Sequence, residues 1–211
     1  ITIGNAIIDI ITDVNDEFLK TLNLVKGSMK IVSSEDLNQI LKLLKNFDFV
    51  AGGSAANTAV GFSSLGGTAS FVGAVGNDDF GKKFKTNIKY EGVDFILGNV
   101  LESNDQTSKS IILVSNDAER TMCTFIGAST NILFKSIDKS IFKEKAIIYI
   151  EGYLFDKIET QQAILDICKI SKNSNLKIAL SLSDKFCVDR HKKKFLNLIH
   201  NYVDILFANE L

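Results

Sequence analysis

The chain has 211 residues, of which 45% are hydrophobic and 23% are charged, and its formal net charge is −1. This length allows one large domain or two small ones, and the apolar share is ample for a packed core, which excludes disorder as the main state. A net charge so close to zero supplies no bulk positive field, so nucleic acid is not an expected partner.

The three cysteines lie far apart, with no C-x-x-C pair and no clustered histidine, so neither a zinc site nor a disulfide framework is indicated. No apolar run reaches the roughly 18 residues of a membrane helix. The first residues also lack the charged and apolar regions of a secretory leader. We therefore expect a reduced, cytoplasmic protein that is neither membrane-spanning nor exported.

Residues 2–11 form a short apolar run whose only interior polar side chains are Asn5 and Asp9. Such a run predicts a buried strand followed by a turn. Residues 34–44 place leucine and isoleucine at helical spacing behind a serine cap, with acidic residues in the first turn. This pattern predicts a surface helix.

A helix rich in small residues is predicted next, opened by Gly52, Gly53 and Ser54 and continuing to Leu65. The two glycines allow the backbone to approach a ligand closely, and Ser54 can cap the helix. Asn57, one turn later, can direct an amide to whatever lies over the helix start. Tight packing of the helix on a sheet explains the same pattern, so the structural and the functional interpretation both remain open.

Residues 68–75 are typical of a strand and residues 80–88 of an amphipathic helix. Between them, residues 76–83 match G-x-x-x-x-G-K, but the final lysine stands where a P-loop requires a serine or threonine for magnesium. The aspartates inside this loop would also repel phosphate oxygens. We therefore reject a P-loop and interpret Asp78 or Asp79 as a helix cap.

Residues 107–127 depart from the alternation of strands and helices, because two apolar segments flank Asn-Asp-Ala-Glu and predict an antiparallel hairpin. The chain then returns to alternating strands and helices, at residues 146–154, 159–172, 177–183, 189–200 and 204–208. Continuous apolar strands that alternate with amphipathic helices predict an α/β fold with a parallel sheet covered on both faces.

Several residues lie near the carboxyl ends of predicted strands, where ligands gather in a parallel sheet. They are Asn5, Asp9, Gly152, Asp184, Asn209 and Glu210. Asn5 and Asp9 offer an amide and a carboxylate suited to vicinal hydroxyl groups, although a turn-forming pair is the plainer interpretation. Asp184 is interpreted as a helix cap, and His191 and His200 as parts of a solvated basic helix.

Five segments, in this order, resemble the ribokinase-like (PfkB-type) family of carbohydrate and nucleoside kinases. They are GNAIID at 4–9, AGGSAANTAVGFSSLGG at 51–67, FVGAVGNDDFG at 71–81, YIEGYL at 149–154 and FANE at 207–210. Three further features are similar to the adenosine-kinase-like branch: the stretch DVNDEFLKTLNLVKGSM, the spacing of Ser54 to Asn57, and SLSDKFCVDR after the late strand.

The resemblance implies a ribokinase-like three-layer α/β/α fold with a mostly parallel sheet and a small β lid. It implies a single domain over residues 1–211 whose C-terminal part is missing, with the lid contributed by about residues 10–33 and 107–127. The activity implied is ATP-dependent transfer of the γ-phosphoryl group, with Mg²⁺, to a primary hydroxymethyl group.

Carried over by position, the resemblance also implies a substrate site. Asn5 and Asp9 would bind sugar hydroxyls, and Tyr153 and Leu154 would form walls for a base. The remainder of the pocket would be lined by Gly52, Gly53, Ser54 and Asn57.

Asn209 and Glu210 match the first half of an Asn-Glu-x-Glu motif that helps to place magnesium and phosphate, with no direct metal ligand assigned. The family's Asp-Thr-x-Gly-Ala-Gly-Asp segment, with the catalytic base and the amides that stabilise the moving phosphoryl group, is expected beyond Leu211. We therefore expect no catalytic residue within this chain and no turnover by it alone, whereas the complete parent protein would be a kinase.

Adenosine is the acceptor favoured by this resemblance, and a ribose- or fructose-type sugar kinase of the same family is the nearest alternative. A non-catalytic module that binds a nucleoside or sugar is an alternative from a different class. The expected partner is a small-molecule nucleoside or sugar, with no nucleic acid and no membrane. The expected state is a monomer or a homodimer.

Overall fold

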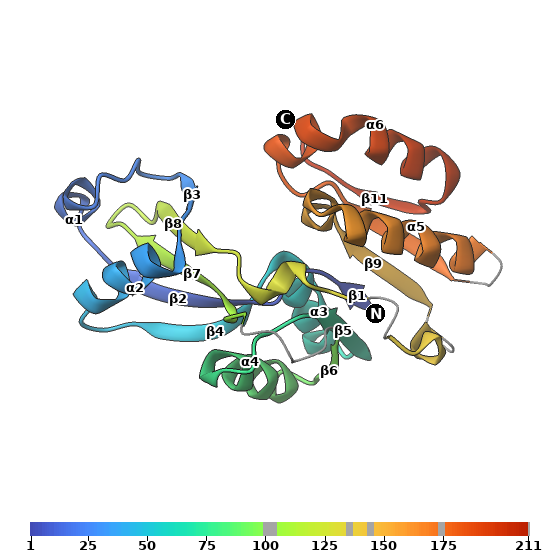
Figure 1. Cartoon of the computed structure of the whole chain (residues 1–211), viewed down its shortest axis with the longest axis horizontal. Helices are drawn as coiled ribbons and strands as arrows, with labels where there is room; N and C mark the ends of the chain where they lie inside the picture. Colours follow the sequence, from blue (N-terminus) through green and yellow to red (C-terminus); the bar gives the residue numbers. More distant parts are fainter. Residues whose placement is uncertain (99–104, 134–136, 143–145, 173–175, 211) are drawn as a thin grey trace.

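Two β-sheets organise the molecule (Figure 1), and the computed structural model describes residues 1–98, 105–133, 137–142, 146–172 and 176–210. In the large sheet the strand order is β11-β10-β9-β1-β5-β6, and every neighbouring pair is parallel. The strands are β1 (Thr2–Ile3), β5 (Ala69–Gly73), β6 (Val93–Leu97), β9 (Ile147–Glu151), β10 (Lys177–Ser181) and β11 (Ile205–Phe207).

Helices cover both faces of the large sheet. Successive side chains along a strand point to opposite faces, so the contacts of neighbouring strand residues identify the helices on each face. Ile3 and Ile150 pack with buried residues of α5 and α6. Phe71, on the opposite face, packs with buried residues of α3 and α4. These helices are α3 (Ser54–Ser64), α4 (Asp79–Tyr90), α5 (Ile158–Lys172) and α6 (Lys185–Asn201). The arrangement is three-layered, which confirms the expected fold class.

The small sheet is mixed and lies at the other end of the molecule from α5 and α6 (Figure 1). Its order is β3-β8-β7-β2-β4, in which β2 and β7 are parallel while β7–β8 and β2–β4 are antiparallel. The strands are β2 (Ile7–Asp13), β3 (Met29–Ile31), β4 (Asp48–Gly52), β7 (Ser108–Val114) and β8 (Arg120–Phe125). Buried Leu19 of α1 (Asp16–Thr21) and Leu37 of α2 (Ser34–Leu43) pack with Ile8 and Ile111 of this sheet.

The single strand predicted at residues 2–11 is wrong, because the chain crosses there from one sheet to the other. Its last bond in the large sheet joins the Gly4 amide to the Val72 carbonyl at 3.2 Å. Asn5 then turns to a buried side-chain partner instead of continuing the ladder, and β2 pairs with the small sheet. The crossing puts Asn5 at the junction and Asp9 within the small sheet.

The predicted hairpin is confirmed as β7 and β8, whose register runs from Lys109–Phe125 to Val114–Arg120. The residues expected to form the lid, 10–33 and 107–127, account for β3, β7, β8 and most of β2 of the small sheet. They omit β4, which ends at Gly52 and was not recognised as a strand. Strand β6 was also missed, and the last helix begins at Lys185 rather than near residue 189.

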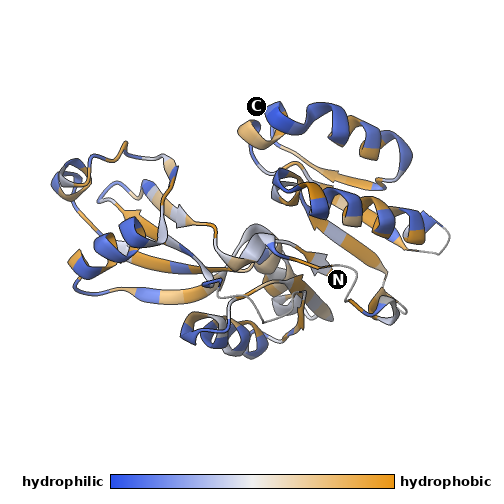
Figure 2. Ribbon diagram, in the orientation of Figure 1, coloured by the Kyte–Doolittle hydropathy of each residue, from blue (hydrophilic) through white to orange (hydrophobic). Residues whose placement is uncertain are grey.

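Short 3₁₀ helices complete the fold: η1 (Ala128–Thr130), η3 (Lys139–Phe142) and η4 (Gly152–Asp156). Figure 2 shows apolar residues concentrated on the strands of both sheets, while polar residues predominate along α4 and α6. This distribution is what burial of the sheets between layers of amphipathic helices requires. Within the described ranges, none of the helices combines the length and the apolar character needed to cross a membrane.

Candidate functional site

The centre of the candidate site is a buried carboxylate that sequence reasoning missed. Glu151 ends β9 and is 1% exposed. Its Oε1 accepts a hydrogen bond from Asn5 Nδ2 at 2.7 Å, and its Oε2 accepts from Ser54 Oγ at 2.8 Å and from the Ala55 amide at 3.0 Å. Burial raises the pKa of Glu151, while the hydrogen bonds from Ser54 and Asn5 oppose that rise. Glu151 thus joins β9, the sheet crossing and the start of α3.

Asn5 is left with one free acceptor atom. The residue is 8% exposed, and its Nδ2 is committed to Glu151. Its Oδ1 is buried and has no hydrogen-bond partner among the described residues. Leaving a buried acceptor unpaired costs about 1–3 kcal/mol, so a ligand hydroxyl that donates to it would recover that energy.

Gly52 and Gly53 let two polar groups lie against the chain at the start of α3. A Cβ at Gly53 would lie 2.2 Å from the carbonyl oxygen of Asn5, and one at Gly52 would lie 2.1 Å from Asp9 Oδ2. Gly53 is the N-cap of α3 with φ of 102°, a conformation that glycine adopts without strain. The pair predicted as pocket lining therefore brings the Asn5 backbone and the Asp9 carboxylate to one place.

Asp9 shares its face of the small sheet with other polar side chains. It pairs in register with Ser110, which in turn pairs with Thr124, and the two hydroxyls are 2.8 Å apart. Burial raises the pKa of Asp9 to about 6, and the positive charge of Arg120 opposes this rise. Arg120 was not singled out from the sequence, because the hairpin itself gives no signal that its first β8 residue faces the same side as Asp9.

The remaining substrate-site residues differ in their surroundings. Ser54 was expected to cap α3, but this is wrong: Gly53 is the N-cap, and the Ser54 hydroxyl donates to Glu151. Asn57 is exposed one turn into α3, with its backbone amide bonded to the Gly53 carbonyl at 2.9 Å. Leu154 is 2% exposed and packs in the core of the large sheet.

Tyr153 is the second residue of η4, the 3₁₀ helix that follows Glu151. Its amide donates to Ser183 Oγ at 3.2 Å, and burial together with the Asp184 carboxylate raises the pKa of its phenol. The ring is partly buried against the core of the large sheet, so part of it stays accessible. Asp184 also caps α6 by accepting from the Cys187 amide at 2.7 Å, as predicted.

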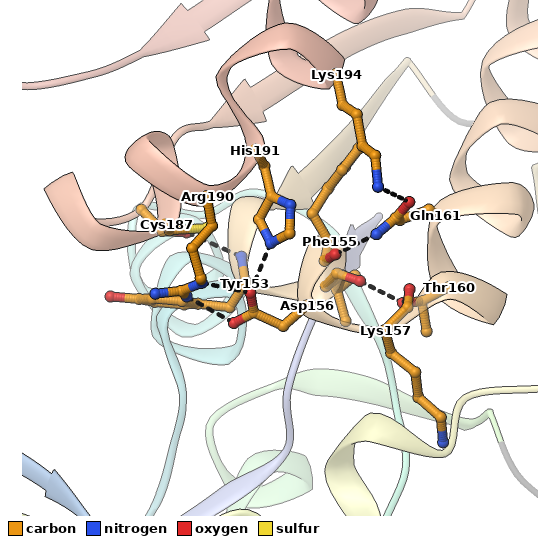
Figure 3. A network of polar contacts seen from close by, with 12 residues as sticks. Tyr153, Phe155, Asp156, Lys157, Thr160, Gln161, Cys187, Arg190, His191 and Lys194 are labelled. Atoms are coloured by element: carbon orange, nitrogen blue, oxygen red, sulfur yellow. Dashed lines mark hydrogen bonds and ion pairs between the residues drawn. The ribbon is translucent and has the colours of Figure 1, made fainter.

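A polar network holds this 3₁₀ helix against α6 (Figure 3). Asp156 accepts two hydrogen bonds from Arg190, at 3.0 and 2.8 Å, and lies 2.6 Å from His191 Nε2. Burial alone would raise the pKa of Asp156, but the bonds from Arg190 and His191 outweigh it and lower that pKa. The solvated role predicted for His191 is wrong, since its side chain is 12% exposed and packs against the rings of both Phe155 and Phe195.

Asn209 and Glu210 follow β11 and are exposed. Because the strands are parallel, they leave the same edge of the large sheet as Glu151. They form no hydrogen bond with the Asn5–Glu151 group within the described part of the chain. No group of three or more histidine, cysteine, aspartate or glutamate residues among the described residues is placed to hold a metal ion.

Buried polar groups thus gather at the carboxyl edge of a parallel sheet, where a small mixed sheet joins it, which is the place where open α/β sheets bind small molecules. The family profile described as "pfkB family carbohydrate kinase" matches residues 20–211. The chain belongs to this family.

Individual relatives have different substrates in their names. The chain is similar to "Probable fructokinase-7" of Arabidopsis thaliana, with 30% identity over 78% of this chain and 49% of that protein. It is also similar to the ribokinase of Haemophilus influenzae, with 26% identity over 65% of this chain and 44% of that protein. The chain thus spans about half the length of the curated relatives that it matches.

Two solved structures are similar over nearly the whole chain. The adenosine kinase from Sinorhizobium meliloti has a TM-score of 0.87 and 35% identity, over 99% of this chain and 64% of that one. The probable sugar kinase protein from Rhizobium etli has a TM-score of 0.88 and 35% identity, over 99% of this chain and 63% of that one. The fold and family are therefore shared by proteins named for nucleoside and for sugar acceptors.

Proposed function

We propose that the complete protein is an ATP-dependent kinase that phosphorylates the primary hydroxymethyl group of a nucleoside such as adenosine. The observation that carries this proposal is the unpaired, buried Oδ1 of Asn5, a residue whose backbone carbonyl lies against Gly53 while the Asp9 carboxylate lies against the neighbouring Gly52. An amide oxygen and a carboxylate, carried by two residues that both approach this glycine pair, suit the vicinal hydroxyls of a ribose ring. The similarity to the Sinorhizobium meliloti adenosine kinase supports the nucleoside form.

The residues present divide the work of acceptor binding. Asn5 Oδ1 would accept from one hydroxyl, while ionised Asp9 would accept from the other more strongly, because a charged acceptor forms the stronger bond. Glu151 contacts no ligand in this scheme and holds Asn5 and α3 in place. Holding the acceptor hydroxymethyl group in position is a large part of catalysis in phosphoryl transfer.

ATP and Mg²⁺ are part of the proposal. Asn209 and Glu210 offer an amide and a carboxylate, and oxygen atoms are the ligands that Mg²⁺ prefers. These two exposed residues would help to place the metal and the phosphates, without being assigned as direct metal ligands. Bound Mg²⁺ would neutralise charge on the phosphates during transfer. The catalytic base is proposed to lie in the part of the longer protein that follows this chain.

The small sheet is proposed to act as a lid over the acceptor. It carries Asp9 on the same face as the Ser110–Thr124 hydroxyl pair, so its closure would bring these groups to the substrate together. Closure would also exclude water and so suppress hydrolysis of ATP. A cytoplasmic monomer or homodimer remains the proposed state, and the buried, unpaired Cys123, Cys168 and Cys187 fit a reducing compartment.

A sugar kinase is the second candidate, because the relatives include a probable fructokinase and a ribokinase. Asn5 and Asp9 would serve a free sugar as well as a nucleoside. The partly accessible ring of Tyr153 favours the nucleoside, since a purine needs an aromatic or apolar wall that a bare sugar leaves unused.

Steady-state phosphorylation by the complete protein separates these candidates. We expect the highest kcat/KM with adenosine, and lower values with ribose and fructose. Turnover of sugars without turnover of any nucleoside would replace the first candidate by the second. Binding of either acceptor with no turnover of any would instead support a non-catalytic binding module.

A further inference from the structure

Helix α4 contacts both sheets. Its Phe84 ring lies 5.4 Å from the ring of Phe95 in β6 of the large sheet. One turn earlier on the same face, Phe80 makes an edge contact with Phe49 of β4 in the small sheet, at 6.4 Å between ring centroids. In Figure 1 the helix accordingly lies next to both β4 and β6. Whatever fixes the position of α4 therefore acts on both sheets.

The first turn of α4 is joined to Thr107, the residue before β7, through the Asp78 carboxylate, both of whose oxygens accept hydrogen bonds. Asp78, the N-cap of α4, accepts from the Gly81 amide at 2.8 Å. The same carboxylate accepts from the Thr107 amide at 2.8 Å and from the Thr107 hydroxyl at 2.6 Å. The Thr107 hydroxyl in turn accepts from the Gly76 amide at 3.0 Å. Thr107 is 0% exposed, so these bonds are shielded from water.

A second contact follows two residues later on β7. Lys109 is 3% exposed, and its Nζ lies 5.0 Å from the ring centre of Phe80 in α4 and 5.7 Å from that of Phe125 in β8. A cation between two aromatic faces is attracted to both, most strongly when it is desolvated. Asp78 supplies the nearby negative charge that balances it.

Near its C-terminal end, α4 is hydrogen-bonded to β4 of the small sheet. Asn87 Oδ1 accepts from the amide of Ala51 at 2.8 Å. Ala51 lies in β4, an edge strand, and immediately precedes Gly52, against which the Asp9 carboxylate lies. The bond therefore fixes the backbone that leads into the candidate site.

We propose that α4 sets the position of the small sheet relative to the large one, with Thr107 and Asn87 as positioning residues for the acceptor site. Asp78 anchors the start of β7 and Asn87 anchors the end of β4, which are the two neighbours of β2, the strand of Asp9. The kinetic consequence of this inference rests on the proposed kinase function, whereas its structural consequence does not.

The test uses the complete protein and pairs each disruptive variant with a conservative one. Thr107→Val removes the hydroxyl, and Thr107→Ser keeps it. Asn87→Ala removes the acceptor, and Asn87→Asp keeps an acceptor oxygen. Ser171→Ala serves as the control, because this serine is 3% exposed and its hydroxyl bonds the Cys168 carbonyl at 2.8 Å within α5, away from the small sheet.

Amide hydrogen exchange is measured strand by strand, together with KM and kcat for the acceptor. For Thr107→Val and Asn87→Ala we expect exchange about tenfold faster in β7 and β4 and unchanged in β5 and β9, since one hydrogen bond is worth up to about a factor of ten. The acceptor KM should rise about fivefold or more. The two conservative variants should restore both values, and the control should change neither.

Exchange in the small sheet that is unchanged, or that rises equally in both sheets, would overturn the inference. An acceptor KM unaltered while the small-sheet amides are deprotected would overturn the positioning role of Thr107 and Asn87. If the exchange follows the expected pattern but the parent protein phosphorylates no nucleoside or sugar, the proposed function fails while the coupling through α4 stands.

Discussion

Glu151 and Asn5 are separated by 146 residues in the sequence and are joined by a hydrogen bond of 2.7 Å from Asn5 Nδ2 to Glu151 Oε1. The bond decides which atom of the Asn5 amide remains available. With Nδ2 committed, Oδ1 is the buried acceptor that has no partner among the described residues. Glu151 therefore determines that this position receives a hydrogen-bond donor, such as a hydroxyl, rather than an acceptor.

Replacing Glu151 by glutamine tests this relationship. The amide would present an NH₂ group to donors that now point at a carboxylate, so at least one of the bonds from Asn5, Ser54 and the Ala55 amide must be lost. We expect Glu151→Gln to lower the free energy of unfolding by about 1–3 kcal/mol and to weaken acceptor binding. Chemical denaturation and titration calorimetry measure the two effects. Glu159→Gln, on an exposed part of α5, is the control and should leave both unchanged. Normal acceptor affinity in Glu151→Gln would show that the orientation of Asn5 is immaterial.

Asp9→Asn should stabilise the protein at pH 7 while it weakens acceptor binding. The pKa of Asp9 is raised by burial from 3.8 to about 6, so its ionised form costs the folded state about 3 kcal/mol at most. The folded-state pKa is higher than the unfolded-state pKa, so the protonated Asp9 carboxyl contributes its full stability below about pH 4. This stability is lost as the pH rises through 6 and the folded protein must ionise Asp9. The wild-type protein should thus lose stability relative to Asp9→Asn between pH 4 and pH 7. Parallel stability curves for the two proteins over that range would contradict the burial of a charged Asp9.

Arg120→Ala should raise the pKa of Asp9 further, because Arg120 is the charge that favours its ionised form. The pH at which acceptor binding is half-maximal should move upward in this variant. Arg120→Lys keeps the charge and should show a smaller shift. NMR titration of the Asp9 carboxyl carbon measures the change directly, and a midpoint that stays in place would remove Arg120 from the account of the site.

Gly53→Ala should be strongly destabilising. Its φ of 102° disfavours a side chain, and the added Cβ would lie 2.2 Å from the Asn5 carbonyl oxygen. We expect a loss of more than about 1 kcal/mol in the free energy of unfolding, together with loss of acceptor binding. Gly61→Ala, in the interior of the same helix, meets nothing within 4 Å and should stabilise α3 by about 0.5–1 kcal/mol. Equal effects of the two substitutions, measured by thermal unfolding, would refute the close approach at Gly53.

The alternating apolar strands and amphipathic helices were enough to predict the layered α/β architecture. The caps at Asp78 and Asp184 were predictable because N-capping depends on a few consecutive residues. The hairpin at residues 107–127 was predictable for the same local reason. The division of residues 2–11 between two sheets was not, because apolar character does not tell a strand which sheet it joins.

The candidate site was predicted only in part. Its glycines and the Asn5–Asp9 pair stand out by type and spacing, whereas Glu151 lies in an ordinary strand and acquires its role from partners 97 and 146 residues away. Long-range pairing of this kind leaves no local pattern. The same holds for His191, whose basic neighbours suggest a solvated helix although Asp156 and two aromatic rings enclose it.

Binding of ligands that keep or lack vicinal hydroxyls tests the central claim most directly. The complete protein is titrated with adenosine, ribose and fructose, and with 2′,3′-dideoxyadenosine as the analogue without the two hydroxyls. We expect the dissociation constant of adenosine to be at least about a hundredfold lower than that of the dideoxy analogue, because the lost bonds include one to a charged acceptor. Equal affinities for the two nucleosides, or binding of none of the three acceptors, would contradict the assignment of Asn5 and Asp9 as the groups that bind substrate hydroxyls.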